Sequence, residues 1–308
     1  MLALAEAMKR RHRYRIQFLV HGEDPSATVN FNSFGFQVAP LESDLVAEVA
    51  RLAETLAPRA VVFDLHPSWV PDCLPALLSD LAGRGIRLIG IDSAASLSDQ
   101  LDVTWIPSFR LESDVAELDS SAVVFGWGSF LIEKHQPSPI WSPGTKVLVT
   151  TGGTDVTRLG KRLPPLLDAE LPHGTSVDWV RGPFAQAPAI PPRPMLEWTV
   201  HEAPRGLDEL AVNANYALVA YGVSLFEILQ YGVPCVVFSP YGGKDDDFMR
   251  ELEREGVASV AYDIDAVVSK LVGLMTDDSV ASAYAEASCA RVQPCGPDRL
   301  AHRIESIL

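Results

Sequence analysis

Two short stretches of the sequence combine glycines with polar side chains in a way that suits binding of a phosphorylated ligand. The first is VLVTTGGTD, in which Gly152, Gly153 and Thr154 follow an apolar run. Glycines at the end of a strand permit a tight turn and let backbone N–H groups approach a phosphate at a helix N-terminus. The alternative is an ordinary strand-to-helix turn in which Asp155 caps the helix. These residues alone leave the two interpretations level.

The second stretch, YGVSLFEILQYGVPCVVF at 221–238, carries one carboxylate, Glu227. Ser224 and Glu227 fit the S-x-x-E capping box, in which each side chain satisfies an open backbone amide. The alternative places Gly222 at the carboxyl end of a strand, with the amides of residues 223–225 facing a pyrophosphate. Glu227 would then accept hydrogen bonds from ribose hydroxyls, because a carboxylate offers only acceptors and a vicinal diol donates twice. From this stretch alone, capping is favoured.

Two histidines follow predicted strands in the first half of the chain and are candidate acid–base groups. His66 comes directly after AVVFDL at 60–65, and His21 follows RIQFLV at 15–20. The ordinary pKa of imidazole suits general base catalysis near neutral pH. The alternative for His66 is a structural role, because the chain enters a loop at Pro67. We name His66 and His21 as candidate catalytic residues with this alternative open.

A run of aspartates at 245–247 raises the question of a metal site. The run also opens a predicted helix, where acidic residues interact favourably with the helix dipole, and we interpret it as a helix start. The sequence contains no zinc-ligand spacing, H-E-x-x-H motif, Walker loop or nucleophile elbow. No metal and no cofactor are predicted.

Alternating strands and helices must position these groups. In the first half we expect strands at 15–20, 34–40, 60–65 and 86–92, short apolar runs near 103–106 and 122–125, and helices at 2–12, 42–56 and 71–82. After a stretch rich in Pro, Ser and Gly at 134–146, we expect strands at 146–153, 176–182, 196–202, 216–222 and 234–240, with helices near 206–213, 245–255, 263–275, 278–290 and 297–308. Such alternation implies crossover units and mostly parallel sheets.

We therefore predict an α/β protein of two Rossmann-like domains that face a cleft. The N-terminal domain covers 1–136, a linker 137–145, and the nucleotide-binding domain 146–308, with its last helix packing back on the first domain. At 308 residues, of which 47% are hydrophobic, the chain is long enough for two such cores.

Composition excludes several classes of partner. A formal charge of −15 argues against a broad nucleic-acid or anionic-membrane surface. No apolar run approaches the ~20 residues that a membrane span needs. The apolar residues at the start precede the basic cluster KRRHRYR, which is the wrong order for a signal peptide. The four cysteines form no C-x-x-C pair, so we expect reduced thiols and a cytoplasmic location.

The two glycine stretches together resemble one family. VLVTTGGTD followed by GLDELAVNANYALVAYGVSLFEILQYGVPCVVF is similar to the C-terminal half of the nucleotide-sugar hydrolases of pseudaminic acid biosynthesis, a family that includes the spore-coat polysaccharide protein SpsG. That family shows G-G-S-D and then G-S-T-x-x-E-x-x-x-x-G-x-P, where this chain has Gly222, Ser224, Glu227, Gly232 and Pro234. The pattern is more distantly similar to the lipid-linked N-acetylglucosaminyltransferase of peptidoglycan synthesis.

The resemblance implies a glycosyltransferase-B type fold with UDP held mainly by the second domain. It also implies a UDP-sugar-binding protein, acting as a nucleotide-sugar hydrolase or related glycosyl-transfer enzyme in surface polysaccharide or nonulosonic acid biosynthesis. Glu227 would bind the ribose and also cap its helix. The nucleotide-binding residues predicted in this way are Gly152, Gly153, Thr154, Gly222, Val223, Ser224, Leu225 and Glu227.

Two departures from the family bear on the chemistry. The family carries G-H-x-x-R, whose histidine is thought to activate water, just before the position at which this chain starts. Its N-Q pair near residue 240 is replaced by YGGKDDDF. We therefore expect a first strand to be missing and UDP binding to outlast catalysis. A second hypothesis is a non-catalytic nucleotide-sugar-binding or partner subunit, and a third is a glycosyltransferase. Oligomeric state is not predicted.

Overall fold

The computed structural model describes residues 1–11, 14–22, 34–65, 72–111 and 122–308, apart from the side chains of 93–96. The chain divides into two compact units. Unit 1 comprises Met1–Leu131 together with Pro294–Leu308, and unit 2 comprises Ile132–Gln293. The last helix therefore belongs to unit 1, although the whole of unit 2 separates it from the rest of that unit in the sequence.

Unit 1 contains parallel strands with helices between them. Its elements are α1 (Leu2–Arg11), β1 (Gln17–His21), β2 (Gly35–Ala39), α2 (Leu45–Leu56), β3 (Ala60–Asp64), α3 (Leu74–Gly83), β4 (Arg87–Ile91), the 3-10 segment η3 (Asp92–Gln100), β5 (Val103–Trp105), β6 (Val123–Val124) and α11 (Gly296–Glu305). Strands β3-β4-β5-β6 form one parallel sheet, and β1 pairs with β2 in a separate parallel pair.

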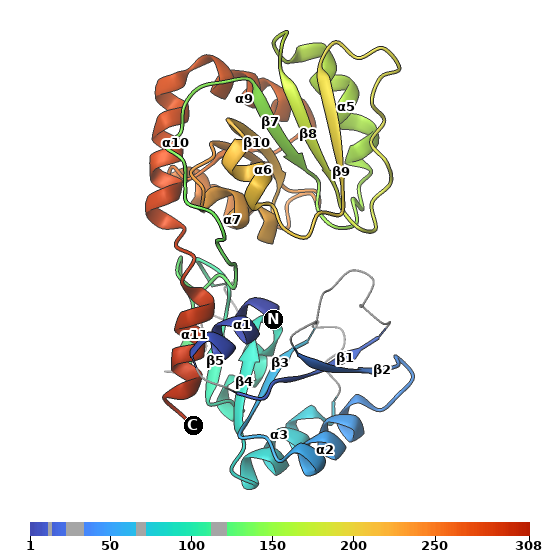
Figure 1. Ribbon diagram of the computed structural model, residues 1–308, viewed down its shortest axis with the longest axis vertical. Helices are drawn as coiled ribbons and strands as arrows, with labels where there is room; N and C mark the ends of the chain where they lie inside the picture. The colour runs from blue at the N-terminus through green and yellow to red at the C-terminus, as the bar shows by residue number, and fades with distance from the viewer. Residues whose placement is uncertain (12–13, 23–33, 66–71, 112–121) are drawn as a thin grey trace. The chain divides into compact units, whose positions relative to one another are not determined.

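The two ends of the described chain share one hydrophobic cluster in unit 1. Leu4, Ala7 and Met8 of α1 pack with Leu300 and Ile304 of α11 against strands β4 and β5. The two helices lie side by side in Figure 1. The apolar face of α11 thus completes the core that the first helix begins.

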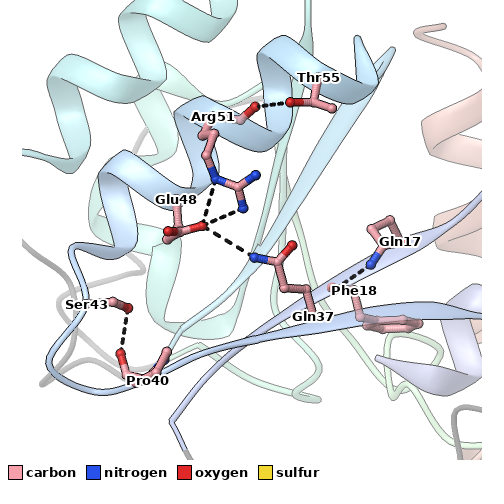
Figure 2. Close-up of polar contacts among 8 residues, drawn as sticks. All are labelled: Gln17, Phe18, Gln37, Pro40, Ser43, Glu48, Arg51 and Thr55. Carbon is pink, nitrogen blue, oxygen red and sulfur yellow. Dashed lines mark hydrogen bonds and ion pairs between the residues drawn. The ribbon is translucent and has the colours of Figure 1, made fainter.

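Polar contacts order the connection from β2 into α2 (Figure 2). Ser43 Oγ donates to the carbonyl of Pro40 at 2.6 Å. The carboxylate of Glu48 accepts from Gln37 Nε2 at 3.4 Å and from Arg51 Nη2 at 2.7 Å. The Glu48–Arg51 pair is largely exposed, so we expect it to orient these side chains more than to stabilise the unit.

Unit 2 is a single doubly wound sheet with helices on both sides. Its elements are β7 (Lys146–Thr150), α5 (Leu159–Glu170), β8 (Ser176–Arg181), β9 (Glu197–Glu202), α6 (Asp208–Asn213), β10 (Tyr216–Ala220), α7 (Val223–Leu229), β11 (Cys235–Phe238), α8 (Asp246–Arg254), β12 (Ser259–Ala261), α9 (Ile264–Thr276) and α10 (Asp278–Arg291). The strands are all parallel, in the order β12-β11-β10-β7-β8-β9 (Figure 1).

Burial on both faces explains why the strands of this sheet are almost uninterrupted apolar runs. Val147 and Val149 of β7 belong to one cluster with α5 and α9. The alternate residue Leu148 is equally buried, and α6 contacts β7 while α7 contacts β10. The fold therefore follows from the strand runs at 146–150, 216–220 and 235–238.

The segment that precedes β7 is held on unit 2, where the sequence predicted a linker from residue 137. Lys134 Nζ and Ser138 Oγ donate to the carbonyl of Gln230 at 2.8 and 3.1 Å. Trp141 Nε1 donates to the carbonyl of Asn215 at 2.7 Å. These contacts attach residues 134–141 to the ends of α7 and α6, so the segment belongs to unit 2.

Candidate functional site

The structure brings the two predicted glycine turns to the same edge of one sheet. Strands β7 and β10 are hydrogen-bonded neighbours, with Thr150 opposite Val219. Because the strands are parallel, the turn at 151–154 and the turn at 221–222 both leave the carboxyl edge. The strand order also reverses here, since β8 and β9 lie beyond β7 and β11 and β12 lie beyond β10. Ligands of doubly wound sheets bind at this kind of switch point.

The first turn depends on glycine backbone geometry. Gly152 has a backbone φ of +93°, a value that residues other than glycine rarely adopt. The neighbouring loop approaches so closely that a Cβ on Gly182 would lie 2.4 Å from the carbonyl oxygens of Gly152 and Gly153. The amide of Phe184 donates to the carbonyl of Gly153 at 3.0 Å. The turn is therefore braced by the chain that follows β8.

Helix α5 does not begin at the glycine turn. It begins at Leu159, and Asp155 adopts a left-handed conformation at φ +46° between them. The carboxylate of Asp155 accepts from the amides of Leu159 and Gly160 at 2.8 and 2.9 Å. The capping interpretation of Asp155 is therefore confirmed. The amides that remain available to a phosphate are those of the turn, including exposed Gly153 and Thr154.

The structure of the second turn differs from the predicted capping box. Helix α7 begins at Val223, with Gly222 as its N-cap and no side-chain capping bond. Ser224 is therefore inside the first turn of the helix, where its hydroxyl does not occupy the cap position. The prediction that Ser224 and Glu227 cap this helix is wrong. Gly222 has φ +155° and ψ −172°, a combination that glycine alone adopts readily.

Because no side-chain cap is formed, helix capping does not explain why a carboxylate stands at position 227. The residue is half-buried, and its side chain accepts no hydrogen bond from the residues that the structure describes. Burial raises its pKa, and the negative charge of Asp208 raises it further. A partly buried carboxylate beside a like charge is costly in the absence of donors. This is the environment that hydroxyl donors of a ligand would relieve.

Asp208 was not apparent from the sequence. It opens α6, and its Oδ1 accepts from the amide of His135 at 3.1 Å and from the hydroxyl of Tyr231. Burial, followed by the hydrogen bond and the charge of Asp208, raises the pKa of Tyr231 to about 12. An acidic residue at the start of a helix is common, so its position alone gives no sign of its electrostatic effect on Glu227.

The remaining predicted residues have separate outcomes. Val223 is largely exposed and Leu225 is fully buried, so the side chain of Leu225 belongs to the core. His21 ends β1 in unit 1, and His66 lies outside the described residues.

Asp246 and Asp247 occupy the first turn of α8, which confirms the helix-start interpretation. Among the described residues, no group of three or more His, Cys, Asp or Glu is arranged to hold a metal ion.

None of the described helices is long and apolar enough to cross a membrane. Neither the protein-family models nor the curated proteins contain a match to this sequence.

Solved structures do match, over nearly the whole chain. A structure of Acinetobacter baumannii MurG has a TM-score of 0.69 at 16% identity, covering 99% of this chain and 94% of that one. The spinosyn forosaminyltransferase SpnP gives 0.67 at 16%, also over 99% and 94%. A S. aureus MnaA–UDP co-structure gives 0.56 at 11%, over 94% and 96%. At these identities the likeness concerns the fold. The predicted glycosyltransferase-B type α/β fold is confirmed.

Proposed function

We propose that this chain binds a UDP-sugar at the carboxyl edge of β7 and β10. It acts as a nucleotide-sugar hydrolase or a related glycosyl-transfer enzyme of surface polysaccharide or nonulosonic acid biosynthesis. The diphosphate contacts backbone amides of the 152–154 turn and of residues 222–224, whereas the amide of Leu225, which was also predicted to bind it, already donates to the carbonyl of Gly222 at 3.1 Å. Glu227 accepts hydrogen bonds from the ribose diol. The S. aureus MnaA–UDP co-structure supports a uridine nucleotide as the ligand to test.

The observation that carries the proposal is the carboxylate of Glu227. The residue is half-buried at the switch point of the sheet, its pKa is raised, and the cap that would have explained it is not formed. Two ribose hydroxyls supply the donors that this carboxylate lacks. The turns at Gly152 and Gly222 both require glycine, and thus expose backbone amides at the same edge.

In the proposed hydrolysis, a water oxygen bonds to the anomeric carbon or to phosphorus. The sugar–phosphate or phosphoanhydride bond breaks with its electron pair on the departing phosphate, and a base takes the proton of water. On sequence grounds that base is His66 or His21. The four cysteines are free, which suits a cytoplasmic enzyme that meets nucleotide sugars.

The experiment is calorimetric titration of UDP into wild type, Glu227→Gln and the control Glu209→Gln, which changes an exposed carboxylate on α6. Loss of charge-assisted contacts to ribose should weaken UDP binding about 10- to 100-fold in Glu227→Gln. The control should bind like wild type. Equal affinities for all three folded proteins would refute the ribose role.

A turnover assay distinguishes an enzyme from a non-catalytic nucleotide-sugar-binding subunit. Release of UDP or of a sugar phosphate from a panel of UDP-amino-sugars is measured for the same proteins. Binding without release across the panel would favour the non-catalytic subunit. Release that depends on an added sugar acceptor would favour the glycosyltransferase.

A further inference from the structure

A cavity of about 180 Å³ lies in unit 2 next to the first glycine turn. Its lining includes Thr154, Asp155, Arg158, Lys161, Phe184 and Gln186. The walls are tied together by backbone hydrogen bonds. The amide of Phe184 donates to Gly153 at 3.0 Å, and that of Ala189 donates to Gly160 at 2.7 Å. The cavity is therefore formed by two loops that hold each other in place.

The charge of this cavity is opposite to that of the chain. Arg158 and Lys161 are exposed, and neither forms an ion pair with a residue that the structure describes. In a protein with a formal charge of −15, two such cations in the lining of one cavity indicate a local preference for an anion. Asp155 is the acid of the lining, and its oxygens are directed at the amides of Leu159 and Gly160. The cations are thus available to an anion.

The lining also includes two apolar side chains that are open to solvent. The side chain of Phe184 is 73% exposed and that of Val156 is 64% exposed. A large exposed aromatic residue beside a cavity is typical of a surface that a ligand covers. A ligand that suits this lining carries an anionic group for the cations and an apolar body for the phenyl ring.

The cavity is distinct from the proposed nucleotide position. It is lined by residues that follow β7 and β8, whereas the turn at Gly222 and the carboxylate of Glu227 follow β10. In the sheet, β8 and β10 lie on opposite sides of β7. Thr154 alone belongs to both the lining and the predicted diphosphate turn.

We propose that this cavity is a second ligand site, which takes a phosphate or carboxylate group attached to an apolar body and is occupied together with a nucleotide. Such a ligand is a co-substrate or effector recognised by Arg158, Lys161 and Phe184. The binding of an anion in the cavity does not depend on the identity of the ligand at β10, whereas its joint occupancy with a nucleotide rests on the proposed function.

Phenyl phosphate and inorganic phosphate are the probes. Both are titrated into wild type, Arg158→Gln/Lys161→Gln, Phe184→Ala and the control Arg162→Gln, an exposed cation of α5 outside the lining. Loss of both cations should weaken phenyl phosphate binding about tenfold or more, and the control should not. Phe184→Ala should abolish the preference for phenyl phosphate over phosphate. Thermal melting of each variant checks folding.

A second arm repeats the phenyl phosphate titration at saturating UDP. Retained binding supports a separate site. Displacement by UDP, or equal binding in the double variant, would overturn the inference. If UDP itself does not bind, the proposed nucleotide function fails, while the titrations of the variants still decide whether the cavity binds anions.

Discussion

The carboxylates of Glu227 and Asp208 interact unfavourably, because the negative charge of Asp208 adds to burial in raising the pKa of Glu227. Asp208 has two donors, the amide of His135 and the hydroxyl of Tyr231. The carboxylate of Glu227 has none from the described residues. In this pair the carboxylate of Asp208 has hydrogen-bond donors, whereas the charge of Glu227 is destabilising in the ligand-free protein.

The first prediction is that Glu227→Gln stabilises the ligand-free protein at neutral pH. Because the folded-state pKa of Glu227 is raised, its contribution to stability is complete below the ordinary value and is lost as the pH rises through the folded-state pKa. Glutamine stays neutral throughout. The melting temperature of the variant should therefore exceed that of wild type at pH 7, each kcal/mol being worth about 2–4 °C.

The same measurement at pH 4 is the control for this prediction. The difference between the two melting temperatures should shrink there, because the pH then lies near the ordinary glutamate pKa of about 4.3, below which the Glu227 carboxyl is increasingly protonated in the unfolded chain as well as in the folded one. Saturating UDP should reverse the order at pH 7. A wild type that is more stable than the variant at pH 7 without ligand would show that the carboxylate already has a favourable partner.

A second prediction concerns backbone strain at the second turn. Gly222→Ala places a side chain at φ +155°, where it meets no atom within 4 Å but adopts a disfavoured conformation. We expect a loss of about 1–3 kcal/mol and weaker UDP binding, because the turn must shift. Gly273→Ala, at an exposed position of α9, is the matched control and should stabilise by about 0.5–1 kcal/mol. Equal melting temperatures for wild type and Gly222→Ala would contradict the strain argument.

A third prediction distinguishes two roles of the Asp155 carboxylate, its negative charge and its hydrogen bonds to the first amides of α5. Asp155→Ala removes the acceptor for Leu159 and Gly160 and strains φ +46°, at a cost of about 1–3 kcal/mol. Asp155→Asn keeps an acceptor and tolerates this φ, so it should cost less. It also removes the acid of the cavity lining, and phenyl phosphate should bind it more tightly than wild type. Weaker binding to Asp155→Asn would count against an anionic ligand.

A fourth prediction concerns stability in acid. Asp168 is buried in α5, and burial would raise its pKa. The amides of Met195 and Leu196 and the indole of Trp198 donate to its carboxylate and lower the pKa instead. Its contribution is thus present above the ordinary pKa and lost as the pH falls through the lowered one. Asp168→Asn should cost about 1.5–3 kcal/mol at pH 7.

Denaturant unfolding at pH 7 and pH 3 tests this. The gap between wild type and Asp168→Asn should narrow at the lower pH, where the wild-type carboxylate begins to protonate. Glu170→Gln, an exposed acid at the end of the same helix, is the control and should be near neutral. A constant gap at both pH values would mean that the charge of Asp168 is not what the three donors stabilise.

The sheet of unit 2 was predictable because its strands are buried on both faces. Runs such as Val147–Val149 and Cys235–Phe238 leave little choice of element. Strand β12, Ser259–Ala261, was missed because three residues between helices carry too little pattern. The pairing of β7 with β10 is a long-range contact that the local pattern of either strand does not indicate, and it became visible only in the register.

The site was less predictable, because one-residue shifts change its chemistry. S-x-x-E is a capping box only if Ser224 is the N-cap, and the helix starts earlier, at Val223. The late start of α5 depends on left-handed backbone at Asp155 and Arg158, which hydrophobic periodicity does not report. The charge of Asp208 near Glu227 arises from tertiary structure, since nothing in the spacing of positions 208 and 227 indicates it.

The membership of α11 in unit 1 has a consequence for the order of folding during synthesis. Residues 132–293 leave the ribosome as one uninterrupted block, so unit 2 has its whole sequence before translation reaches α11. Unit 1 must wait for Leu300 and Ile304 to cover Leu4 and Met8. Until then its first 131 residues expose that apolar surface. The nascent chain is thus expected to fold its second unit first, and a chain that ends at residue 293 and has been released from the ribosome should display a protease-resistant unit 2 beside a protease-sensitive N-terminal segment.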